Sequence, residues 1–164
     1  MKSYTFTLTT QPQLCPLPCD KASVAVEITG RDDLSLFELA HALLGAIGFD
    51  SDHAFGFHEG LDSVYRAKGK RYTLFADIGE DEDAAAGVSA TRVADVFSPG
   101  QKMLFHFDYG DDWHFFVTCD AIEESAATRP STKRLSVTGV LPSQYDDDDD
   151  DDDWDDEDWD DSDE

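Results

Sequence analysis

Apolar and polar residues alternate with a period of two in several short segments, which is the pattern of half-buried β-strands. Apolar side chains occupy every second position over residues 3–9, 23–29 and 53–58, and a shorter alternation covers 72–76. A last, brief alternation lies at 135–137. These segments predict a β-rich protein with strands along most of the chain.

One segment has helical spacing instead. Ser35 and Glu38 have the S-x-x-E spacing of a capping box, which predicts that a helix begins here. An apolar stripe with a period near 3.6 follows, formed by Leu36, Leu39, Ala40, Leu43 and Ile47. Gly48 predicts the end of the helix. A second, short helix is predicted over 89–97, ended by a Ser-Pro-Gly sequence.

Residues 102–120 carry the most informative pattern. Two alternating runs, both rich in aromatic residues, flank the turn sequence Gly110-Asp111-Asp112, which predicts a β-hairpin. Both faces of this hairpin carry aromatic side chains, so we expect it to lie centrally in a sheet, with at least one face under a helix. The fold class that follows is α+β, with a mainly antiparallel sheet, one long helix and one short helix.

Charge divides the 164-residue chain into two parts. It has 37 acidic and 12 basic side chains and a net charge of −25. Sixteen of the 19 residues in 146–164 are acidic and none is basic. The remaining 21 acidic and 12 basic side chains give residues 1–145 a net charge of −9. We therefore expect one folded domain over 1–145 and a disordered Asp-rich tail over 146–164.

Composition excludes several classes of protein. No stretch of about 18 apolar residues is present, which argues against a membrane protein. The first residues lack the apolar run of a signal peptide, so a cytoplasmic location is expected. Direct binding to nucleic acid is not expected, because phosphate contacts need positive charge and both parts of the chain are acidic. Lys68, Lys70 and Arg71 form a basic cluster large enough for an ion pair with the tail but not for DNA.

The three cysteines do not suggest a disulfide framework. Cys15 and Cys19 lie in the sequence CPLPC, and Cys119 lies in the predicted hairpin. An odd, low number of cysteines without an export signal favours free thiols in a Pro-rich loop. The C-x3-C spacing differs from the C-x2-C of most redox and zinc motifs. No cofactor is expected, because the sequence has no phosphate-binding, dinucleotide-binding or zinc-protease motif.

The hairpin also carries a resemblance. HFDYGDDWHFFV resembles the Y-x-Y-D-F-G-D-x-W-x-H segment of the plasmid pRiA open-reading-frame-three-like family, whose members are often labelled insertion-element passenger proteins. The helix and its continuation GFDSDHAFGFH, the lead-in SATRVADVFSPGQKMLFHFDYG and the terminal GVLPSQY resemble other segments of that family. The resemblance covers roughly residues 4–145. It implies a fold and an association with mobile elements, but no reaction and no functional residues.

The sequence departs from the family pattern in three places. The segment QLCPLPCDKASVAV lacks the family's Trp and Arg pair, and Trp113 is followed directly by His114 and two phenylalanines. The Asp-rich tail is not a family feature.

Three interpretations of the hairpin's polar residues remain open, and one of them is contact with a ligand or a partner. Carboxylates and imidazoles gather within nine residues and can hold a divalent metal that activates water; the candidate ligands are His106, Asp108, Asp111, Asp112 and His114. A small metal-dependent hydrolase would use Asp108, Asp111 and His114 for catalysis, together with His106. His53, His58 and Glu59 join them if their strands are neighbours. Alternatively, Asp108 and Asp111 cap the amide groups of their own turn, and Gly110 supplies a positive φ.

The tail has its own expected role. Its charges repel one another, so it is expected to stay extended. Two alternatives remain open: the tail only solubilises the protein, or it binds a basic protein partner, with Trp154 and Trp159 as the candidate partner-binding anchors. The leading hypothesis from sequence is a non-enzymatic interaction module with an acidic tail; the alternative is the metal-dependent hydrolase.

Overall fold

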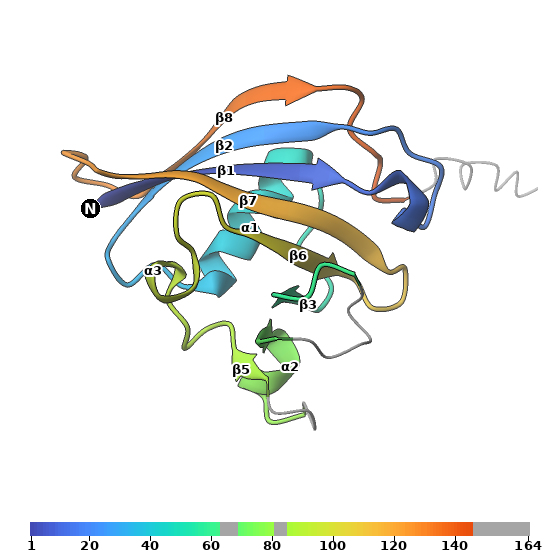
Figure 1. Cartoon of the computed structure of the whole chain (residues 1–164), viewed down its shortest axis with the longest axis horizontal. Helices are drawn as coiled ribbons and strands as arrows, with labels where there is room; N and C mark the ends of the chain where they lie inside the picture. Colours follow the sequence, from blue (N-terminus) through green and yellow to red (C-terminus); the bar gives the residue numbers. More distant parts are fainter. Residues whose placement is uncertain (63–68, 81–84, 146–164) are drawn as a thin grey trace, which may run out of the picture.

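The computed structural model describes residues 1–62, 69–80 and 85–145, and these residues form an eight-stranded sheet (Figure 1). The strand order is β5-β4-β3-β6-β7-β1-β2-β8, and every neighbouring pair is antiparallel except β4 and β5. The strands are β1 (Lys2–Thr10), β2 (Ser23–Gly30), β3 (Phe55–His58), β4 (Arg71–Thr73), β5 (Ala86–Gly87), β6 (Lys102–Phe107), β7 (Trp113–Glu124) and β8 (Ser131–Thr138). This confirms the expected α+β class and its mainly antiparallel sheet.

The long helix α1 (Leu36–Ile47) forms as its sequence predicts. Ser35 accepts a hydrogen bond from the Glu38 N–H at 3.2 Å, and the Glu38 carboxylate accepts one from the Ser35 N–H at 2.8 Å, which completes the capping box. Gly48 ends the helix with φ 79°, a conformation that costs glycine little. Within the described residues, no helix is long and apolar enough to cross a membrane. The cytoplasmic location stays a prediction.

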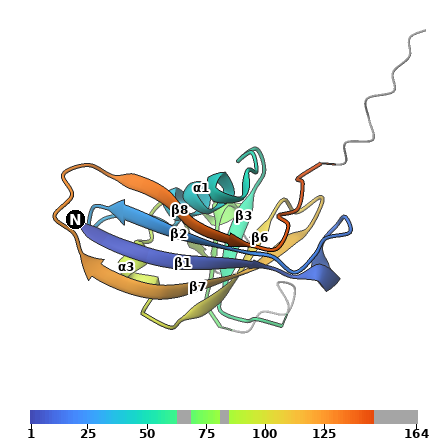
Figure 2. The ribbon, with the colours of Figure 1, turned by 90° about the horizontal axis from the view of Figure 1, so that it is seen from above.

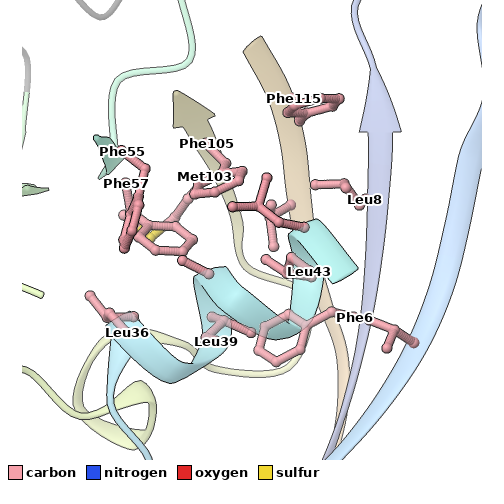
Figure 3. Packing of buried hydrophobic residues seen from close by; sticks show 14 of the residues in the cluster. Phe6, Leu8, Leu36, Leu39, Leu43, Phe55, Phe57, Met103, Phe105 and Phe115 are labelled. Atoms are coloured by element: carbon pink, nitrogen blue, oxygen red, sulfur yellow. The ribbon is translucent and has the colours of Figure 1, made fainter. Parts of the chain in front are cut away.

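The core lies between α1 and one face of the sheet (Figure 2). Leu36, Leu39 and Leu43 of α1 point toward aromatic and aliphatic side chains of β1, β3, β6 and β7 (Figure 3). Those partners include Phe6, Leu8, Phe55, Phe57, Met103, Phe105 and Phe115. Burying each of the large side chains contributes about 1.5–3 kcal/mol. This packing fixes the inner face of the hairpin and leaves its outer face for other groups.

The predicted hairpin is confirmed and lies where expected. Strands β6 and β7 occupy the middle of the strand order, between β3 and β1. β7 continues to Glu124, beyond the predicted end at residue 120, because it pairs with the whole length of β1. The expectation of a positive φ at Gly110 is wrong, because the turn places this conformation at Asp108, with φ 59°, and at Asp112, with φ 67°. Aspartate tolerates this conformation better than most residues.

The strand predicted over 72–76 is only partly present. β4 ends at Thr73, and the Thr73 hydroxyl accepts a hydrogen bond from the Ala76 N–H at 3.1 Å. That bond caps the short helix α2 (Leu74–Asp77) and turns the chain away from the sheet. The second predicted helix is present as α3 (Val93–Val96).

The expectation of two free thiols in the Pro-rich loop is wrong. Cys15 and Cys19 form a disulfide, with their Cα atoms 6.3 Å apart. This Cα separation lies inside the range of about 4.4–6.8 Å that a disulfide spans, so the C-x3-C spacing after the 3-10 turn η1 (Pro12–Leu14) permits a bridge. Cys119 is the free cysteine, and it is buried. The acidic segment 146–164, with Trp154 and Trp159, lies outside the described residues, as does Lys68.

Candidate functional site

A row of three histidines crosses the outer face of the sheet, opposite α1. Along β6 the inward residues Phe105 and Phe107 alternate with His106, which therefore faces outward. The register pairs His106 with His114 of β7 and with Gly56 of β3. The rings of His106 and His114 stack with centroids 4.7 Å apart, and the His58 ring lies 6.3 Å from His106 on the other side.

Asp112 completes a cluster at one end of this row. Asp112 lies in the turn and has a positive φ. Its Oδ1 atom lies 2.5 Å from His106 Nε2 and 3.9 Å from His114 Nε2. His114 Nδ1 lies 2.8 Å from the backbone carbonyl oxygen of Asp112. One ligand atom from each of His106, Asp112 and His114 lies within 4.8 Å of the other two. Two imidazoles and a carboxylate at this spacing form a set that divalent metals use.

Burial controls the chemistry of these imidazoles. His106 is 1% exposed and His114 6% exposed, whereas the Asp112 side chain is 40% exposed. Burial lowers the pKa of His106, and the neighbouring His114 lowers it further, although hydrogen bonding to Asp112 opposes both effects. The Tyr109 ring meets His106 edge-on at 4.5 Å and so covers part of the outer face. The cluster therefore consists of two buried imidazoles that reach solvent on the side of Asp112.

Asp108 has a different role from Asp112. Its Oδ1 accepts hydrogen bonds from the N–H groups of Gly110 and Asp111, both at 3.1 Å, and its carbonyl oxygen accepts one from Asp112 N–H at 2.5 Å. The other carboxylate oxygen lies 3.4 Å from His53 Nε2. Asp108 is 5% exposed and holds the turn in shape, as an Asx turn does. Asp111 is exposed and lies outside the ligand cluster.

A second structure, the C-terminal strap, supports this end of the sheet. The strap is the segment 142–145, and its Gln144 is 7% exposed. The Gln144 amide accepts from Asp50 N–H at 2.6 Å and donates to the Asp50 carbonyl at 3.1 Å. Tyr145 donates to Asp52 at 2.6 Å, which lowers the pKa of Asp52 and raises that of Tyr145 to about 12. His53, next along this loop, contacts Asp108, so the strap and the turn are connected.

The sequence-predicted site residues thus divide into two groups. The structure brings together His106, Asp112 and His114, whereas Asp108 and Asp111 do not join them. His58 lies in the histidine row, His53 contacts Asp108, and Glu59 accepts a hydrogen bond from the Lys70 N–H at 2.8 Å. Sequence reasoning missed Gln144; the terminal motif GVLPSQY was its only signal, and it carried no contact information.

Comparisons with known proteins agree with this architecture. A family model described as plasmid pRiA4b ORF-3-like protein matches residues 19–140. A crystal structure of a protein of unknown function from Methanosarcina mazei Go1 is similar, with a TM-score of 0.57 and 13% sequence identity. The match covers 80% of this chain and 67% of that chain, and at this identity it shows the fold alone. No curated protein matches the sequence.

Proposed function

The chain belongs to the plasmid pRiA4b ORF-3-like family, and we propose that it is a non-enzymatic interaction module that binds a basic protein through its acidic segment 146–164. The observation that carries the proposal is the concentration of 16 acidic residues and two tryptophans in those 19 positions. Such a segment attracts a basic surface over a long range, and its tryptophans supply apolar anchors. The mobile-element association of the family is part of this proposal.

The folded part of the chain supports the proposal in two ways. First, the strap fastens the residues that precede the acidic segment, through Gln144 on Asp50 and Tyr145 on Asp52, so the segment starts from a fixed place on the body. Second, the carboxylate of the buried Asp108 accepts hydrogen bonds from two N–H groups of its own turn, which is a structural role. Nucleic acid is not the proposed partner, since residues 1–145 also have a net charge of −9.

The test is a titration of the full chain with a lysine-rich peptide, with tryptophan fluorescence as the measure of binding. Trp113 is buried, so Trp154 and Trp159 report on binding. Raising the salt from about 0.01 M to about 0.15 M shortens the Debye length from about 30 Å to about 8 Å, and affinity should fall steeply.

The matched control replaces the eight aspartates at 146–153 with asparagine, which keeps length and volume but removes charge. Binding should then be lost at every salt concentration. Equal affinity of the two proteins for the peptide would exclude the polyanion mechanism. Replacement of Trp154 and Trp159 by leucine, followed by calorimetry, separates the apolar anchors from the charge.

A small metal-dependent hydrolase is the second candidate, because His106, Asp112 and His114 converge. This candidate needs a metal-bound water, and Asp108 is not available as its general base while it holds the turn. The assay is hydrolysis of an activated phosphodiester by the full chain with Zn²⁺ or Mn²⁺ and with a chelator. Turnover that needs the metal and disappears in Asp112→Asn, but not in Asp111→Asn, would favour the hydrolase over the interaction module.

A further inference from the structure

We propose that His106, Asp112 and His114 form a Zn²⁺ site with three protein ligands and one position open to water. The site rests on neither the partner of the acidic segment nor a hydrolytic activity. It is argued from the protonation of one imidazole, the ligand separations, the ligand types and the exposure of the cluster.

The hydrogen bond of His114 fixes which of its nitrogens can bind metal. Its Nδ1 lies 2.8 Å from the Asp112 carbonyl oxygen, and a carbonyl oxygen can only accept. Nδ1 therefore carries the proton, and the lone pair lies on Nε2, the atom that faces the Asp112 carboxylate at 3.9 Å. Metal-bound histidines in proteins are commonly oriented in this way, with the other ring nitrogen donating to a carbonyl or carboxylate.

The two separations from Asp112 need only a small movement of the carboxylate, while the stacked rings of His106 and His114, 17° apart in plane, must turn so that both Nε2 lone pairs meet at the ion. Zn–N and Zn–O bonds of about 2.0–2.1 Å at a tetrahedral angle place neighbouring ligand atoms about 3.3 Å apart. Asp112 Oδ1 now lies 2.5 Å from His106 Nε2 and 3.9 Å from His114 Nε2. A movement of the carboxylate by less than about 1 Å, away from His106 and toward His114, meets both values. The zinc ion then takes the place of the proton on His106 Nε2, and the ring stays neutral by carrying its proton on Nδ1 instead.

The surroundings favour zinc over the alkaline-earth ions. Two imidazoles with one carboxylate suit Zn²⁺, whereas Mg²⁺ and Ca²⁺ prefer oxygen ligands throughout. Both imidazoles are buried and start from the central strands β6 and β7, so the sheet holds their backbone positions before binding. The Asp112 side chain is 40% exposed, which gives the ion a route of entry and leaves the fourth position to water.

The experiment is a Zn²⁺ titration of the full chain, by competition with a chromophoric chelator, in millimolar Mg²⁺. The carboxylates of 146–164 bind divalent ions weakly and without fixed geometry, and the excess Mg²⁺ occupies them. Three variants separate the site from this background. Asp112→Asn removes the charged ligand and keeps a side chain that tolerates φ 67°. Asp111→Asn makes the same change one residue away, outside the cluster. His114→Asn keeps a donor near the position of Nδ1 and removes Nε2.

We expect one Zn²⁺ per chain in the wild type and in Asp111→Asn, and an affinity at least about tenfold lower in Asp112→Asn and His114→Asn. Co²⁺ in place of Zn²⁺ should give the intense visible bands of a four-coordinate ion, and these should vanish in Asp112→Asn. If Asp112→Asn and Asp111→Asn bind Zn²⁺ equally, or if Co²⁺ keeps the spectrum of its aqueous ion, the site does not exist. Zinc binding without turnover of the phosphodiester would remove the hydrolase and leave the site intact.

Discussion

The strap is tested most directly by Gln144→Ala. The Gln144 amide makes two hydrogen bonds to the backbone of Asp50 and a third, at 3.1 Å, to the Asp52 carboxylate. A hydrogen bond contributes about 0.5–1.5 kcal/mol net, and a partner left buried without one costs more. Asp50 itself is exposed, so water replaces part of what is lost. We therefore expect a loss of about 2 kcal/mol in the free energy of unfolding.

That loss corresponds to a fall in Tm of about 4–8 °C for a domain of this size. Urea unfolding, monitored by circular dichroism, measures the free energy of unfolding. The control is Gln13→Ala, because Gln13 is exposed on the Pro-rich loop. The slope of the transition should not change. If the free energy of unfolding of Gln144→Ala lies within about 0.5 kcal/mol of the wild-type value, the strap does not hold the 50–53 loop. The acidic segment would then not start from a fixed place on the body.

Three further predictions concern the thiols, the turn and the tail. Burial raises the pKa of Cys119 to about 11, so the native protein should not react with a thiol reagent at pH 8. Denatured, unreduced protein should give one thiol per chain. A result of three thiols per chain would contradict the Cys15–Cys19 disulfide. The same raised pKa predicts that stability is full below the pKa of an unfolded thiol and falls as the pH rises from about 9 toward 11. Asp108→Ala should lower the free energy of unfolding, measured in urea, by about 1–3 kcal/mol. The N–H groups of Gly110 and Asp111 lose their acceptor, and alanine is strained at φ 59°. An unchanged free energy would exclude the role of Asp108 in holding the turn. Deletion of 146–164 should leave Tm within about a degree in calorimetry; a drop of several degrees would show that the segment docks on the body.

Most of the fold could be predicted from local patterns. The period-two segments became β1, β2, β3, β6 and β7, and the capping box with its apolar stripe became α1. These elements could be predicted because each one buries a single face against the same core. Apolar residues therefore recur at a regular spacing along each segment. The strand predicted over 72–76 is wrong beyond Thr73, because the Thr73 side chain caps a helix there. A threonine fits a strand and a helix cap equally well, so the sequence pattern did not distinguish the two.

The candidate site was only partly predictable. The sequence placed His106, Asp108, Asp111, Asp112 and His114 near one another, but it could not say which of them share a face. That depends on the register of β6 against β7 and on the backbone of the turn, where two aspartates with positive φ send their carboxylates in different directions. Gln144 was beyond reach for another reason: its partners lie 94 residues away in the chain.

Strand β8 has a consequence for how this protein behaves in solution. Among the described residues its one neighbour is β2, and all of its side chains are exposed. An open edge of this kind invites copies of a protein to polymerise through backbone pairing. Here a bulge interrupts the register at Leu135, between Arg134 and Ser136, and the adjacent Lys133 and Arg134 place like charges where two such edges would meet. The irregular, cationic rim should therefore keep concentrated protein from forming fibrils.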